Sequence, residues 1–73
     1  MHAALIPFPE ALADACGKLQ AATDHDRLRN QYEYQQGLLR GYYCAGVIAD
    51  VQLRAALDQL RAVHHERFMA VRA

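Results

Sequence analysis

Apolar side chains recur at intervals of three and four residues along most of this chain, a spacing that places them on one face of an α-helix. The segment IPFPEALADAC is the first example. Pro9 suits its first turn, where the missing N–H of proline costs no hydrogen bond. We expect a short helix over about residues 9–22. Its predicted packing face consists of Phe8, Leu12, Ala15, Cys16 and Leu19.

Two short breaks divide the rest of the chain into two longer helices. Thr23 or Asp24 in TDHDR can cap a second helix, which is predicted over about residues 24–45. Gly46 then ends that helix in the left-handed conformation that glycine tolerates, and residues 46–49 form a turn. Asp50 caps a third helix over about residues 50–72. This turn resembles that of short bacterial helical-hairpin modules, a resemblance that implies a topology but no function.

Both longer helices have an apolar face, which predicts that they pack together as an antiparallel hairpin. No segment alternates with the period of two that is typical of a β-strand. The expected fold is therefore all-α, with a short N-terminal helix followed by the hairpin, in one domain over residues 1–73. The face of the second helix consists of Leu28, Tyr32, Gln35, Leu39 and Tyr42. That of the third consists of Leu53, Leu57, Leu60, His64 and Val71, with Phe68 at its edge.

The second helix also has a face of small residues. Gly37, Gly41 and Ala45 recur every four residues, flanked by Tyr34 and Leu38. Each glycine weakens a helix by about 1 kcal/mol, so their shared face suggests the close approach of another backbone. Either the first helix or a second copy of the chain can cover this face. We expect self-association through Gly37, Gly41, Ala45 and Leu38.

The size of the chain also favours a homodimer. A domain of 73 residues buries only about 60% of its unfolded surface and is usually marginal alone. Much of its apolar content is alanine, so its own core must be thin, and a second subunit would complete it. No signal peptide and no apolar run of membrane-spanning length is present, which leads us to expect a cytoplasmic protein with reduced cysteines.

Metal and catalytic chemistry find little support in the sequence. His64 and His65 are adjacent and diverge by about 100° on a helix, and no zinc-binding spacing includes Cys16 or Cys44. Cys44 near a histidine would be the only nucleophile–base pair, in a chain too short to enclose a deep pocket. We therefore predict no enzyme activity, no catalytic residue, no metal and no cofactor. His64 is interpreted as a core or interface histidine.

A row of cationic residues on the third helix is the best candidate binding site. It lies about 100° from the apolar stripe, and Asp58 within it can pair with Arg54 and Arg61. Arginine and tyrosine dominate interface hot spots, and the arginine fork fits carboxylates. We predict that an acidic protein surface binds here. The expected partner-binding residues are Tyr34, Tyr43, Arg54, Arg61, His65 and Arg72.

These features favour a non-enzymatic protein-binding module. Its most plausible role is that of a small cytoplasmic inhibitor or adaptor, of the kind carried by phages and other mobile elements, which occludes a partner surface. The alternative is a small nucleic-acid-associated transcriptional regulator that uses the arginine stripe in a dimer. A net charge of zero disfavours this alternative. The segment YYCAGVIADVQLRAAL superficially resembles a helix-turn-helix. Its recognition helix would be DVQLRAALDQL, which opens with an acid and has few base-reading side chains, so this also disfavours the alternative.

Overall fold

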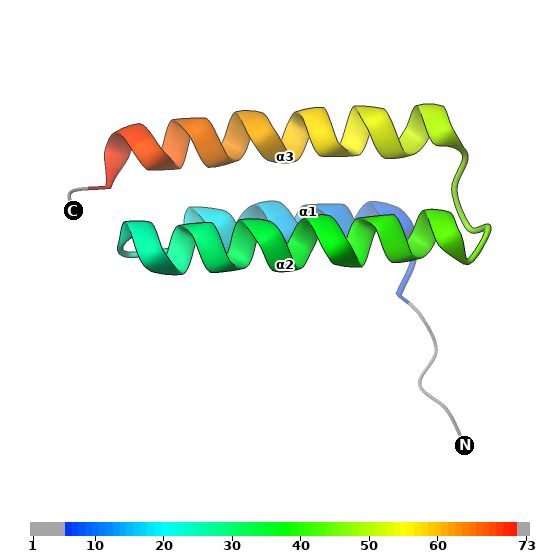
Figure 1. Ribbon diagram of the computed structural model, residues 1–73, viewed down its shortest axis with the longest axis horizontal. Helices are drawn as coiled ribbons and strands as arrows, with labels where there is room; N and C mark the ends of the chain where they lie inside the picture. Colours follow the sequence, from blue (N-terminus) through cyan, green and yellow to red (C-terminus); the bar gives the residue numbers. More distant parts are fainter. Residues whose placement is uncertain (1–5, 72–73) are drawn as a thin grey trace, which may run out of the picture.

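The computed structural model describes residues 6–71, in which three α-helices and no strand are present. They are α1 (Phe8–Gln20), α2 (His25–Cys44) and α3 (Asp50–Ala70), and each packs against the other two. Figure 1 shows α2 and α3 side by side, with the start of α2 next to the end of α3. The stacking of the His25 ring on the Phe68 ring agrees with this arrangement. The prediction of an all-α fold is confirmed.

The break between α1 and α2 lies where the sequence predicted it. α1 ends at Gln20, two residues earlier than expected, and α2 begins after Asp24. The Asp24 side chain accepts a hydrogen bond from the Arg27 N–H at 2.8 Å. This bond satisfies one of the N–H groups that a helix start leaves free, so Asp24, rather than Thr23, is the cap.

The turn between α2 and α3 confirms one prediction and corrects another. Gly46 has a φ of 78°, and the Gly46 and Val47 N–H groups donate to carbonyls of the last turn of α2, as expected for a glycine-terminated helix. Asp50, however, does not cap α3. The cap residue is Ala49, whose N–H donates to the Gln52 side chain at 2.8 Å, so Asp50 is already helical.

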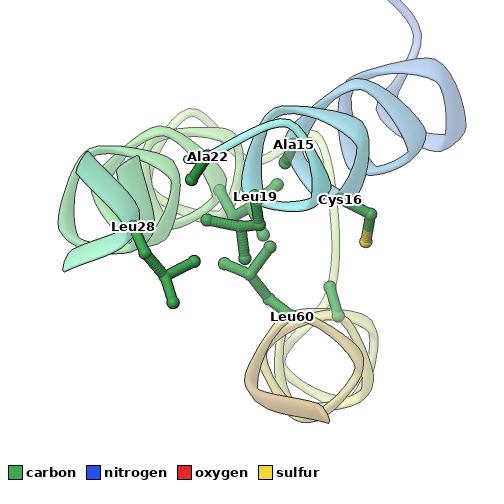
Figure 2. Packing of buried hydrophobic residues seen from close by; sticks show 8 residues of the cluster. Ala15, Cys16, Leu19, Ala22, Leu28 and Leu60 are labelled. Atoms are coloured by element: carbon green, nitrogen blue, oxygen red, sulfur yellow. The ribbon is translucent and has the colours of Figure 1, made fainter. Parts of the chain in front are cut away.

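Leucines from all three helices meet in the core. Leu19, Leu28 and Leu60 point toward one another in Figure 2, and Leu39 is also fully buried. The predicted face of α2 is confirmed, with Tyr32 only partly buried. On α3 the buried pair is Ala56 and Leu60. The other described positions of the predicted stripe are only partly buried: Leu53, Leu57, His64 and, just beyond the helix, Val71.

A smaller cluster ties the start of α1 to the turn. The Tyr42 hydroxyl donates to the Ile6 carbonyl at 2.7 Å, and the Phe8 and Tyr42 rings meet edge to face. Ala11 and Ile48 are buried beside them. Val47 remains half exposed, so of the two aliphatic residues after Gly46 only Ile48 joins this cluster.

Candidate functional site

Large apolar side chains remain exposed on two opposite sides of α2. Tyr34, Leu38 and Tyr43 expose 63%, 37% and 42% of their surface. Leu38 follows Tyr34 by about one turn and shares its side, whereas Tyr43 follows Tyr34 by two and a half turns and faces the other way. The two tyrosines predicted to bind a partner therefore do not lie on one surface.

Tyr43 lies on the side of α2 that borders α3. Tyr32 marks this side because its ring stacks on that of His64, with the ring centroids 4.2 Å apart. Tyr43 comes three turns after Tyr32 and therefore lies on the same side. On α3, Phe68 marks the matching border, because it stacks on His25 of α2.

The predicted cations of α3 follow the same border. Arg61 precedes Phe68 by seven residues and Arg54 by fourteen, which keeps all three on one stripe of the helix. His65 is also exposed, farther from α2. We call Tyr43, Arg54, Arg61 and His65 the arginine–tyrosine face. Arg72 lies outside the described residues.

The arginines of this face form only exposed local ion pairs. Arg54 pairs with Asp50 at 3.2 Å, not with Asp58 as the spacing suggested, and Arg61 pairs with Asp58 at 3.8 Å. All four side chains are more than 60% exposed. Exposed pairs of this kind contribute about 0–1 kcal/mol, so both guanidinium groups can exchange their partner for another carboxylate at little cost.

The small residues of α2 form a second surface, beside Tyr34. A Cβ built on Gly37 or Gly41 would meet no other atom within 4 Å, and Ala45 is exposed. Of the two coverings predicted for this side, α1 is therefore ruled out: α1 instead contributes Ala15, Cys16 and Leu19 to the buried cluster that also contains Leu39 of α2 and Leu60 of α3. We call Tyr34, Gly37, Leu38, Gly41 and Ala45 the glycine face.

Histidine 64 and the cysteines occupy different environments. Burial, and to a lesser extent the charge of His65, lowers the pKa of His64. Burial raises the pKa of the Cys16 thiol, outweighing a 3.9 Å hydrogen bond from Gln59, so this thiol is a poor nucleophile. Cys44 is free and exposed. Within residues 6–71 no three metal-ligating side chains come together.

The role of His25 is not visible in the sequence pattern. Its Nε2 lies 3.3 Å from the Phe68 carbonyl oxygen and 3.2 Å from that of Val71. Nearby, the Arg67 Nε–H donates to the Ala22 carbonyl at 2.9 Å. These residues are more than 40 positions apart along the chain, so no local pattern pairs them.

The surface of the described part contains open grooves. One lies between the end of α1 and the start of α2, with Lys18, Arg27 and Asn30 along it. None of α1, α2 and α3 combines the length and the apolar character that crossing a membrane requires. No protein-family model, curated protein or solved structure matches the chain.

Proposed function

We propose that this chain is a non-enzymatic protein-binding module that binds an acidic protein surface through its arginine–tyrosine face. The observation that supports this most is the exposure of Tyr43 on the same border as Arg54 and Arg61. In this proposal the protein is a cytoplasmic inhibitor or adaptor, which acts by covering a surface of its partner.

The chemistry of the face suits such a partner. Tyrosine brings a large, stiff apolar surface at low entropic cost, and truncation of such anchors typically costs 2 kcal/mol or more of binding energy. Each guanidinium group can hold a carboxylate with two parallel hydrogen bonds. The exposed ion pairs with Asp50 and Asp58 are weak enough for partner carboxylates to replace them.

Homodimerisation belongs to the same proposal. The hairpin of α2 and α3 would pair with a second copy through the glycine face, where small residues let two helices approach closely and Tyr34 and Leu38 supply apolar area. The arginine–tyrosine face lies on another side of α2, so a dimer would present two copies of it.

Charge reversal on the arginine–tyrosine face tests partner binding. Arg54→Glu combined with Arg61→Glu should abolish capture of the partner from lysate, because acids would then face acids, while circular dichroism shows unchanged helicity. A matched control is Lys18→Glu combined with Arg27→Glu. These side chains are also exposed and locally paired, and the change in net charge is the same, but they line the groove between α1 and α2.

The proposal requires a protein of fixed stoichiometry that the wild type and the control retain and the reversed variant loses. Equal capture by both variants would remove the arginine–tyrosine face from consideration. A gel-shift measurement at two salt concentrations covers the alternative: steep, salt-dependent DNA retention would favour a nucleic-acid regulator instead.

A further inference from the structure

The apolar core of the molecule ends well before the end of α3. Leu60 is the last buried residue of this helix, and every described residue from 61 to 71 is partly or fully exposed. Phe68 and Met69 expose 45% and 71% of their surface. Among the last ten helical residues only Val63, itself partly buried, packs against the main core cluster, whereas the first half of α3 contributes Leu53, Ala56, Leu57 and Leu60.

Polar and aromatic contacts attach this part of α3 to the rest of the molecule. Three of them are hydrogen bonds: His25 Nε2 donates to the carbonyls of Phe68 and Val71, and the Arg67 Nε–H donates to the Ala22 carbonyl in the α1–α2 loop. The others are ring stacks, His25 on Phe68 at 4.3 Å and Tyr32 on His64 at 4.2 Å. The three hydrogen bonds and the His25 stack lie at one end of the bundle, where the loop before α2 meets the last turns of α3 (Figure 1).

We propose that residues 61–71 form an arm that opens while the three-helix core stays folded, and that His25 is its latch. Local opening is easiest where few apolar contacts are buried and the hydrogen bonds are near solvent. The described arm contains no buried residue, and the hydrogen bonds that attach it are exposed or only partly buried.

The geometry of His25 explains why this residue is the latch. Both groups near its Nε2 are carbonyl oxygens, which only accept, so Nε2 must carry a hydrogen and donate it. The Phe68 carbonyl belongs to the last turn of α3, whose carbonyls have no partner within the helix, and Val71 directly follows that helix, so His25 holds the helix end through both carbonyls. Its ring also covers one face of Phe68, nearly parallel at 8°.

Opening of the arm would divide the arginine–tyrosine face. Arg61 and His65 lie on the arm, whereas Tyr43 and Arg54 lie on the core side of Leu60. A partner that contacts both halves would therefore bind only the closed arm. This consequence rests on the proposed function, but the arm itself does not.

Amide hydrogen exchange of the isolated protein tests the arm. The amides of residues 65–70 should exchange at least about tenfold faster than those around Leu28 and Leu39. His25→Ala should speed exchange in the arm by a further factor of about ten, the effect of losing one hydrogen bond and a stack, and leave the core amides unchanged. His65→Ala is the matched control: it removes an exposed histidine of the same helix and should change neither rate.

Two results would overturn the proposal. If the arm and core amides of the wild type exchange at one common rate, α3 opens only together with the whole bundle. His25→Ala leaving the arm rates unchanged, or raising arm and core rates equally, would remove the latch. Arg67→Ala, which deletes the neighbouring hydrogen bond, should speed the arm alone as well. Since no partner is present, these outcomes are independent of the charge-reversal experiment.

Discussion

Gln35 brings an amide into the centre of a leucine core. Its side chain is fully buried, and its Nε2 donates to the Gln31 Oε1 at 3.2 Å. Its own Oε1 has no hydrogen-bond partner among the described residues. A buried acceptor without a partner costs about 1–3 kcal/mol, which makes Gln35 a local weakness of the core.

Replacement of Gln35 by an apolar residue of similar shape should therefore stabilise the protein. We expect Gln35→Met to raise the free energy of unfolding by about 1–2 kcal/mol, measured by urea denaturation. Gln20→Met, at an exposed position on α1, is the control and should change stability by less than about 0.5 kcal/mol. A destabilised Gln35→Met would mean that the amide has a partner, such as a bound water, that repays its burial.

His64 should make stability fall in mild acid. Its pKa is lowered in the folded state, so the unfolded chain takes up the proton more readily, at its ordinary value near 6.5. The contribution of His64 is thus complete above about pH 6.5 and is lost as the pH falls through the lowered value. We expect His64→Phe, which keeps an aromatic ring against Tyr32 but cannot titrate, to lose less stability than the wild type between neutral pH and pH 5. Equal losses in urea midpoint would contradict this.

At the scale of helices, local rules predicted most of the fold. Asp24 begins α2 and Gly46 ends it, each through hydrogen bonds to residues no more than four positions away, so both roles are visible in the sequence. The spacing of leucines gave the faces of α2 and part of α3. The buried alanines were less visible: Ala11 and Ala56 are 1% and 2% exposed, but alanine suits any helix position, so its periodicity carries little information.

The remaining contacts depend on how the helices meet. His25 and Arg67 find their partners across more than 40 residues, and helical spacing cannot indicate such pairs. The position of α1 was also open in the sequence, because both faces of α2 are non-polar. In the structure Ala15, Cys16 and Leu19 of α1 share one buried cluster with Leu39 and Leu60, and the glycine face stays exposed.

The cap of α2 gives a prediction for a single element. Asp24→Ala should lower the free energy of unfolding by about 1 kcal/mol, because the Arg27 N–H loses its acceptor. Asp24→Asn keeps a side-chain oxygen at the same place and should restore most of that loss, although it also removes the exposed ion pair with Arg27. Urea denaturation of the three proteins separates the cap from the charge. Equal destabilisation by Asn and Ala would assign the effect to charge instead.

For the molecule as a whole, the balance between buried and exposed large apolar residues bears on whether the chain dimerises. Within residues 6–71, six large apolar residues are buried: Leu19, Leu28, Leu39, Tyr42, Ile48 and Leu60. Eight are exposed in the described residues, and Tyr34 and Leu38 among them lie beside Gly37 and Gly41. A monomer of this size gains little from so thin a core, so pairing of two glycine faces would add the burial that the single chain lacks.

Gly41→Leu separates the stability of the monomer from self-association. A side chain at this position meets nothing within 4 Å in the single chain, and leucine favours a helix over glycine by about 0.8 kcal/mol, so the variant monomer should be more stable. In a dimer the same side chain would keep the two α2 helices apart. Light scattering at tens of micromolar should therefore find the wild type dimeric and Gly41→Leu monomeric, although the variant unfolds at a higher urea concentration when both are dilute. Gly17→Leu, at an exposed and equally open glycine of α1, should gain the same stability and remain dimeric. A monomeric wild type, or a Gly41→Leu variant that still dimerises, would exclude the glycine face as the dimer interface.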